Sequence, residues 1–393
     1  MTIQHTWNQH VVKKGNKSIV FQYIINHTPI SRADIAKATG LNKSTVSSLV
    51  SELLDENLIY ESGPGESSGG RRPVMLLFNE LSGFSIGIDL GVNYLLGILT
   101  DLSGNIVNEE KVHFTELPYE QIQEELFTMI TTLIKNAPSS TYGVIGIGIG
   151  VPGAVNKEGE VLHAPNLMWE NVKLKSIVEE KYSIPVIIAN EANAGAYGEK
   201  KFGAGKDANN LVYVSAGTGI GAGLILNGQL YQGNNGFSGE MGHMTIEVDG
   251  PQCTCGSNGC WELYASEKAL LIKAALVQKT AVSSEISLEA LLKLAPEDPH
   301  ILNLFKEIGT YLGVGINNII QTFNPDHVII GNRLEAAKHY LNNPIVTYIK
   351  EHTQPFHQNE LEVSFSQLST HSTALGVAAF TVESFLQIEL VTT

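Results

Sequence analysis

Residues 211–228 read LVYVSAGTGIGAGLILNG: an apolar run, a glycine-rich turn at residues 217–221, and a second apolar run. Short apolar runs bounded by glycine predict two strands joined by a turn. Because glycine lets backbone amides approach an oxyanion closely, the turn is a candidate ligand contact. The same residues are equally consistent with a tight strand-to-strand connection, and the sequence leaves both interpretations open.

The chain upstream repeats this pattern. Three strands are predicted at residues 84–91 (FSIGIDLG), 94–101 (YLLGILTD) and 105–114 (NIVNEEKVHF), then a helix at 119–135 and a buried strand at 144–153 (VIGIGIGVPG). Two α/β lobes that each begin with a strand and a glycine-rich turn resemble the duplicated ribonuclease-H-like fold of sugar kinases and actin. We expect a first lobe over residues 79–190, completed by a C-terminal helix at 371–390, and a second lobe over residues 191–370.

A compact set of metal-ligand residues follows the second glycine-rich turn. His243, Cys253, Cys255 and Cys260 lie within eighteen residues, in a segment rich in turn-forming residues. A Cys3His set closes a tetrahedral zinc site, and four protein ligands leave no coordination position for substrate or water. We therefore expect a structural Zn²⁺; free structural thiols are the alternative.

Hydrogen-bonding side chains flank the predicted zinc loop. Glu240 and Glu262 lie on either side of it, and Asn190 and Glu191 end a strand of the preceding lobe. Carboxylates and amides of this kind pair with neighbouring sugar hydroxyls, and His243 can bind zinc through one ring nitrogen and face the ligand with the other. Each acid taken alone is better explained as an exposed or capping carboxylate; together, beside a zinc loop, they predict a sugar pocket.

The first 78 residues predict a winged helix-turn-helix. Apolar spacing indicates helices over residues 16–27, 31–40 and from 42 onward, and strands at 58–61 and 74–78 bracket a Gly/Ser-rich hairpin. Such a domain reads the major groove with its third helix and contacts phosphate or the minor groove with its wing. The candidate DNA contacts are Ser31, Arg32, Asn42, Lys43, Ser44, Thr45, Ser47, Ser48, Arg71 and Arg72. A trihelical protein-docking module is the alternative, but it leaves the arginine pair of the wing unexplained.

The charge distribution agrees with this division. The 393 residues carry a net charge of −15, which disfavours generic nucleic-acid binding. Residues 1–78, however, hold eight Lys and Arg against six Asp and Glu, so any DNA contact belongs there. All three cysteines lie between Cys253 and Cys260, and no apolar run reaches the ~18 residues of a membrane span. We expect a cytoplasmic protein that is not bound to a membrane.

With these motifs the sequence resembles the ROK family (repressors, open reading frames and kinases) over essentially its whole length. The zinc signature is residues 239–262 (GEMGHMTIEVDGPQCTCGSNGCWE), the sugar motif is residues 190–195 (NEANAG), and the wing carries GRRP at 70–73. The fused winged domain is similar to that of ROK repressors, which implies operator DNA as a partner and xylose or a similar sugar as the effector. By resemblance, the implied sugar contacts are Asn190, Glu191, Glu240, His243, Glu262, Gly153 and Asn166.

The sequence departs from the family's kinases at the ATP-handling positions. Those kinases have Asp as the base where this chain has Glu191, which is one methylene longer, and a DxGGT pattern where this chain has Asp89 and Gly91 followed by Val92 and Asn93. The adenosine-side glycine cluster is reduced to residues 331–333. The resemblance therefore implies a homodimeric sugar sensor that is not an enzyme and whose operator binding the sugar relieves. An active kinase with an autoregulatory DNA-binding domain is the alternative, and co-repression by the sugar is indistinguishable from induction in the sequence.

Overall fold

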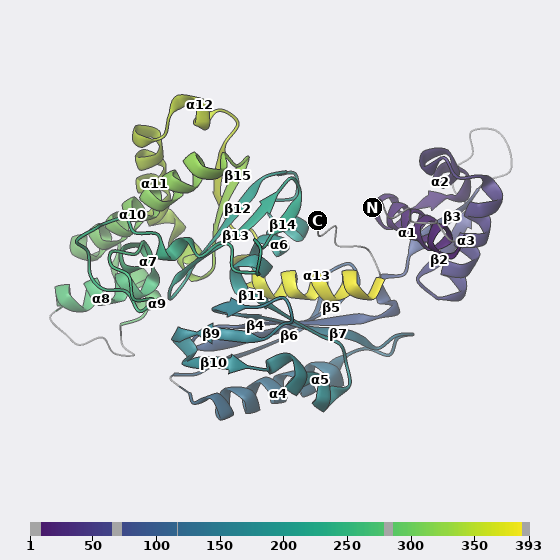
Figure 1. Ribbon diagram of the computed structural model, residues 1–393, viewed down its shortest axis with the longest axis horizontal. Helices are drawn as coiled ribbons and strands as arrows, with labels where there is room; N and C mark the ends of the chain where they lie inside the picture. Colours follow the sequence, from purple (N-terminus) through teal and green to yellow (C-terminus); the bar gives the residue numbers. More distant parts are fainter. Residues whose placement is uncertain (1–8, 65–72, 116, 279–285, 387–393) are drawn as a thin grey trace, which may run out of the picture.

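The computed structural model of the chain describes residues 9–64, 73–115, 117–278 and 286–386. Figure 1 shows a small N-terminal domain at one end of the molecule and two α/β lobes, with helix α13 (Ser372–Leu386) lying along the first lobe and pointing toward the small domain. Within the described ranges, no helix is both long and apolar enough to cross a lipid bilayer.

The N-terminal domain is the predicted winged helix-turn-helix. Its elements are α1 Gln9–His27, β1 Ile30–Ser31, α2 Arg32–Thr39, α3 Lys43–Asp55, β2 Ile59–Pro64 and β3 Val74–Phe78, with sheet order β1-β3-β2. Ser31 caps α2, Gly40 ends it in the left-handed region at φ 72°, and Asn42 caps α3. Helix α1 begins earlier than the predicted residue 16, and its added turns place Lys13 against Glu52 of α3.

The two lobes contain sheets of the same topology. In the first, β4 Phe84–Leu90, β5 Tyr94–Asp101 and β6 Ile106–His113 are antiparallel neighbours, and β7 Val144–Val151 and β11 Val186–Asn190 add parallel strands beyond β4. In the second, the equivalent strands are β12 Leu211–Ala216, β13 Ile220–Leu226, β14 Gln229–Tyr231, β15 His327–Gly331 and β16 Glu362–Phe365. The repeated order, β6-β5-β4-β7-β11 and β14-β13-β12-β15-β16, confirms the duplicated α/β fold.

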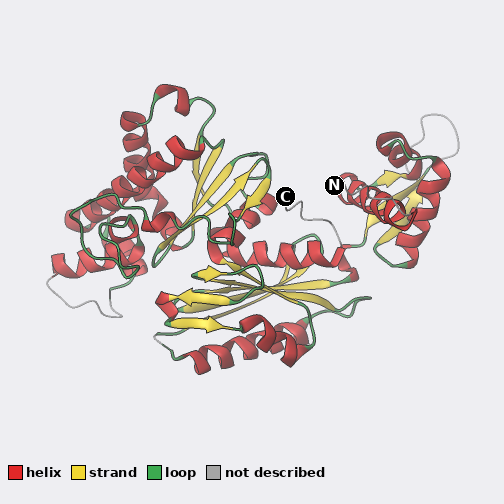
Figure 2. Ribbon diagram, viewed as in Figure 1, coloured by secondary structure: helices red, strands yellow, loops and turns green. Residues whose placement is uncertain are grey.

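Helices cover the outer faces of both sheets, as Figure 2 shows. The first lobe carries α4 Tyr119–Asn136, α5 Leu174–Tyr182 and a small sheet of β8 Ala154–Val155, β9 Val161–Ala164 and β10 Trp169–Val172. The second carries α7 Glu262–Ala265, α8 Glu267–Gln278, α9 Leu288–Leu294, α10 Pro299–Phe323, α11 Lys338–His352 and α12 Pro355–Gln358.

Two helices, α6 (Glu191–Phe202) and α13, pack between the sheets. A Cβ built on Gly148 of β7 would lie 2.3 Å from the Val377 carbonyl of α13, and one on Gly223 of β13 would lie 2.2 Å from the Ala192 carbonyl of α6. Each helix therefore rests directly on sheet backbone. This close approach explains the alternating glycines of VIGIGIG, which let a helix lie against the strand without intervening side chains.

Candidate functional site

Asn190 and Glu191 lie where β11 passes into α6. Asn190 caps the helix by accepting bonds from the Ala192 and Asn193 amides at 2.9 and 3.1 Å, and its own amide donates to the Gly153 carbonyl at 3.0 Å. Gly153 has φ 119°, and a Cβ there would meet the His163 carbonyl at 2.4 Å. The structure thus brings together two of the predicted sugar contacts, Asn190 and Gly153.

Glu191 is the centre of a hydrogen-bond chain between the lobes. Its carboxylate accepts from Ser215 Oγ at 3.3 Å, and Ser215 in turn accepts from the Asn332 amide at 2.9 Å. Its backbone carbonyl accepts from Thr373 Oγ1 of α13 at 3.1 Å. Burial raises the pKa of Glu191 to about 7, and the nearby charge of Glu240 acts in the same direction.

Asp89, at the end of β4, is the most deeply placed acid of the site. Tyr94 donates its hydroxyl to one carboxylate oxygen of Asp89 at 2.6 Å, while the other oxygen has no partner among the residues that the structure describes. Burial first, and the charge of Glu191 second, raise the pKa of Asp89 to about 8. Tyr94 and Ser215 were not predicted from the sequence, because a Tyr and a Ser in apolar strands carry no signal by themselves.

The four predicted metal ligands converge. His243 ends a short 3₁₀ turn (Met241–His243) that follows β14, and its Nδ1 is 3.7 Å from Cys253 Sγ; Cys255 Sγ and Cys260 Sγ are 3.6 Å apart. All four ligand atoms lie within 4.8 Å of one another. Tetrahedral zinc with bonds of about 2.0–2.3 Å requires ligand separations of roughly 3.5–3.8 Å, and the His243–Cys253 and Cys255–Cys260 pairs have this spacing, so the Cys3His donor set suits this ion. Burial raises the pKa of Cys260 to about 12, and a bound cation would favour its thiolate.

Glu262 connects the metal ligands to the acids. One carboxylate oxygen lies 3.4 Å from Cys253 Sγ and 3.6 Å from His243 Nδ1. The other lies beside Gly219, where a built Cβ would be 2.9 Å from Glu262 and 3.8 Å from the Asn166 amide. We call Asp89, Glu191, Glu240 and Glu262 the acid cluster.

Glu240 lies between Glu191 and Glu262 and is exposed to solvent. Desolvation and the charge of Glu262 raise the pKa of Glu240, whereas His243 lowers it. All seven predicted sugar contacts therefore belong to one polar region. The glycine-rich turn connects two antiparallel strands, Gly217 N donating to Gly219 O at 3.0 Å, and it also borders this region.

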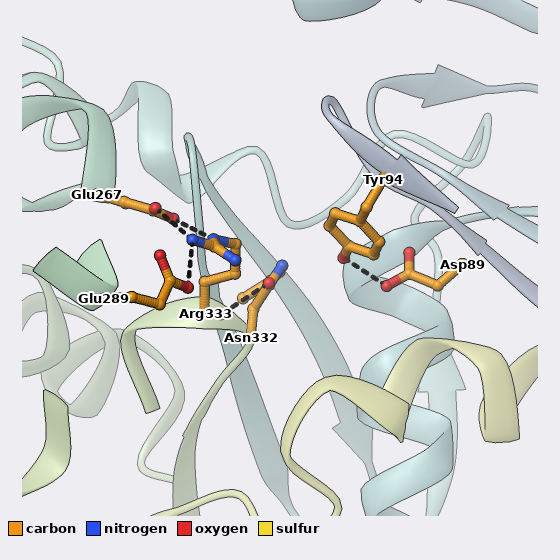
Figure 3. A network of polar contacts seen from close by, with 7 residues as sticks. Asp89, Tyr94, Glu267, Glu289, Asn332 and Arg333 are labelled. Atoms are coloured by element: carbon orange, nitrogen blue, oxygen red, sulfur yellow. Dashed lines mark hydrogen bonds and ion pairs between the residues drawn. The ribbon is translucent and has the colours of Figure 1, made fainter. Parts of the chain in front are cut away.

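A second polar network, around Arg333, lies opposite the Asp89–Tyr94 pair (Figure 3). The Arg333 guanidinium donates to both carboxylate oxygens of Glu267, at 2.8 and 2.9 Å, and to Glu289 at 3.0 Å. The Glu267 amide donates to the Gly217 carbonyl at 2.9 Å. Here each acid faces a cation, in contrast to the acid cluster.

The candidate DNA-contact residues gather on the start of α3. Asn42, Lys43, Ser44, Ser47 and Ser48 are exposed and Thr45 is half-buried. Two residues of α2's start are otherwise engaged: Ser31 is 4 % exposed and accepts from the Asp34 amide, and Arg32 pairs with Glu61 at 2.7 Å. Arg71 and Arg72 lie outside the described residues.

Family models match two parts of the chain. The ROK family model matches residues 85–384 and the MarR family model matches residues 14–72. The two matches divide the chain as the fold does, into the winged domain and the two-lobed domain.

Individual relatives match over nearly the full length. The chain is 47 % identical to the xylose repressor of Bacillus spizizenii and 46 % identical to that of Bacillus subtilis, in each case over 97 % of this chain and 98 % of the relative. A crystal structure of a ROK family transcriptional regulator, a homolog of the Escherichia coli Mlc protein, matches with a TM-score of 0.80 and 31 % identity over 97 % of this chain and 100 % of that one.

A kinase is among the similar structures as well. The ROK family glucokinase of Streptomyces griseus, solved in complex with glucose and AMPPNP, matches with a TM-score of 0.70 and 28 % identity, covering 76 % of this chain and 99 % of the kinase. The 300-residue family match and the full-length relatives leave one conclusion: the chain belongs to the ROK family.

Proposed function

We propose that this protein is a transcriptional repressor whose binding to operator DNA is relieved by xylose or a similar sugar. The observation that carries the proposal is the presence, on one chain, of an exposed polar face on α3 and an acid cluster that has no Lys or Arg ion pair among the described residues. The relatives named as xylose repressors support both the function and the sugar.

The sugar site comprises Asn190, Glu191, Glu240, His243, Glu262, Gly153 and Asn166. Ionised carboxylates accept hydrogen bonds from sugar hydroxyls, and each such bond to a charged group is worth about 1.5–3 kcal/mol. The site combines a partly buried base, Glu191, with solvent-exposed residues, Glu240 and Asn166, at its edge. This arrangement allows a small polyol to enter from water and to be held on several sides.

The role of zinc is structural in this proposal. His243, Cys253, Cys255 and Cys260 would hold the ion, which supplies a fixed tetrahedral centre. Because Glu262 contacts Cys253 and His243, and Glu240 precedes His243 by three residues, the closed loop holds both acids in place.

DNA binding is assigned to the winged domain of a homodimer. Lys43, Ser44, Ser47 and Ser48 would enter the major groove with Asn42 and Thr45 beside them, and Arg71 and Arg72 would contact phosphate or the minor groove. The side chains of Ser31 and Arg32 have partners within the domain. We therefore assign Ser31 the role of a helix cap and place Arg32 at the edge of the DNA contact. Two copies related by a two-fold axis suit a palindromic operator in the cytoplasm.

We further propose that the chain does not phosphorylate the sugar at ordinary kinase rates. Asp89 is held by Tyr94, and Asn332 fills the space beside Gly217, where a Cβ would lie 3.0 Å from its amide. Purified protein with ATP, Mg²⁺ and xylose or glucose should show no turnover near the ~1–100 s⁻¹ typical of kinases. Turnover in that range would establish the alternative, an active kinase with a DNA-binding domain.

The direct test is an operator gel shift with a panel of pentoses and hexoses. Induction predicts that xylose weakens operator binding by about 5- to 150-fold, the usual range of allosteric coupling. Stronger binding with sugar would identify a co-repressor instead, and unchanged binding with every sugar would refute sugar sensing.

A further inference from the structure

Helix α13 runs from beside α6 toward the winged domain (Figure 1), and its two ends contact the candidate sugar site and the winged domain. At its start, Thr373 donates to the Glu191 carbonyl at 3.1 Å. At its other end, Val382 is 8 % exposed in an apolar cluster with Val20 and Leu53 of the winged domain. Fifteen helical residues span about 22 Å, so a single rigid element joins the two regions.

Helix α6 is bound to α13 along most of its length. A Cβ on Gly198 would lie 2.1 Å from the Ser372 carbonyl, and one on Gly376 would lie 1.8 Å from the Ala194 carbonyl, so the two backbones touch. Hydrogen bonds join α6 to both ends of α13. At the start of α13, Ser372 donates to Glu199 at 2.8 Å, and near its end Glu383 accepts from Tyr197 at 2.5 Å. A side-chain shift at Glu191, the first residue of α6, is therefore transmitted to α13 without an intervening soft contact.

The contact with the DNA-reading helix is small and specific. Phe385 of α13 packs edge-on against Tyr142, with ring centroids 4.9 Å apart, and the Tyr142 hydroxyl donates to the carbonyl of Glu56, the C-cap of α3, at 2.6 Å. Beside this contact lies a groove of about 460 Å³. The groove is lined by side chains of α1, α3 and α13, among them Lys17, Glu52 and Phe385, and by Tyr142.

The groove limits the area over which the winged domain is fixed to the first lobe. Beside the groove, the buried side chains of Leu102, Ile145 and Val382 continue the apolar cluster of the winged domain into the first lobe and α13, so a shift of α13 is transmitted to the winged domain. The Phe385–Tyr142–Glu56 contact, which we call the joint, connects α13 to the C-terminal end of α3 within this junction.

We propose that α6 and α13 move as one body that transmits sugar binding at Glu191 through the joint to α3. The proposal rests on the proposed function, since it names the residues by which the sugar acts on DNA binding. Helix displacements of about 1–2 Å at an interface are enough for allosteric switching, and displacement of Phe385 by that amount would carry the C-terminal end of α3 with it.

The test is a double variant, Tyr142→Phe with Phe385→Ala, in the full-length protein. Two measurements are made: xylose affinity by calorimetry, and operator affinity by fluorescence anisotropy with and without saturating xylose. We expect xylose affinity within about twofold of wild type, because neither residue touches the acid cluster. The ratio of operator affinities without and with xylose should fall from about 5- to 150-fold to less than about twofold.

Matched variants control for loss of a hydroxyl or a ring elsewhere. Tyr182→Phe removes a similar bond, to the Phe127 carbonyl at 2.7 Å, and Phe356→Ala removes an exposed ring on α12; both should keep the wild-type ratio. If Phe385→Ala prevents folding, Tyr142→Phe alone must still lower the ratio. A full wild-type ratio in the folded joint variant overturns the transmission route, whereas a ratio of one in wild type overturns the proposed function itself.

Discussion

The Arg333 network and the acid cluster, of which Figure 3 shows the Asp89–Tyr94 pair, differ in how their acids are neutralised. Glu267 and Glu289 share the guanidinium of Arg333, so their charges are compensated within the protein. Among the described residues the acid cluster has no Lys or Arg ion pair, and the pKa values of Asp89, Glu191 and Glu240 are raised instead. A compensated network stabilises a fold, whereas an uncompensated one costs stability and is explained by a ligand that hydrogen-bonds to it.

Removal of zinc should give the largest difference between the two networks, because it should weaken xylose binding at the acid cluster and leave the Arg333 network in place. Chelation, or Cys260→Ser, releases the loop that carries Glu240, His243 and Glu262, and loss of two or more bonds to charged groups predicts at least about a 100-fold loss of xylose affinity. The Arg333 network should persist, so far-UV circular dichroism should change little. Calorimetry measures the loss, and Zn²⁺ added back to the chelated protein should reverse it; unchanged xylose binding without metal would separate the loop from the sugar site.

Arg333→Met should destabilise the second lobe. Glu267, with its side chain 6 % exposed, would lose its cation, and a broken buried ion pair costs about 3 kcal/mol of unfolding free energy. Lys273→Met, which removes a more exposed pair with Glu307 in the same lobe, should cost less than about 1 kcal/mol. Urea unfolding measures both, and equal effects of the two variants would contradict the assignment of Arg333 as a brace.

Glu191→Gln should have the opposite effect to Arg333→Met, in that it should weaken xylose binding and leave the fold stable. Xylose affinity should fall by about 10-fold or more through loss of a bond to a charged group, while unfolding free energy at pH 8 stays the same or rises. The control is Glu179→Gln on α5, whose carboxylate accepts from the backbone amide of Val186, at the start of β11, at 3.0 Å. This variant should leave xylose affinity unchanged. If Glu191→Gln lowered the unfolding free energy as much as Arg333→Met does, Glu191 would stabilise the fold instead of binding the sugar.

The smallest predicted effect is a pH dependence. Because the folded-state pKa values of Glu191 and Asp89 are raised to about 7 and about 8, the folded protein holds protons that the unfolded chain has released. Stability should therefore fall as the pH rises from about 5 to 8, and the fall should be shallower in Glu191→Gln. Urea midpoints at four pH values in this interval measure the slope. A rise in wild-type stability over the same interval would contradict the raised pKa values.

Features set by local sequence were predictable. Ser31 and Gly40 delimit α2 as expected, and the four predicted metal ligands meet because their spacing confines them to one loop. Features set by distant contacts were not. Thr373 is 182 residues from Glu191, and Tyr142 is 86 residues from Glu56. No local pattern identifies such partners, so the link between the sugar site and α3 required the structure.

Release of operator DNA by xylose bound at the acid cluster can be measured directly. Fluorescence anisotropy of labelled operator, titrated with protein at several xylose concentrations, measures this release for wild type and Glu191→Gln together. We expect xylose to release wild type, and to release Glu191→Gln only at about 10-fold or more higher xylose, at equal operator affinity without sugar. Operator affinity that is the same at every xylose concentration in wild type would contradict release by the sugar.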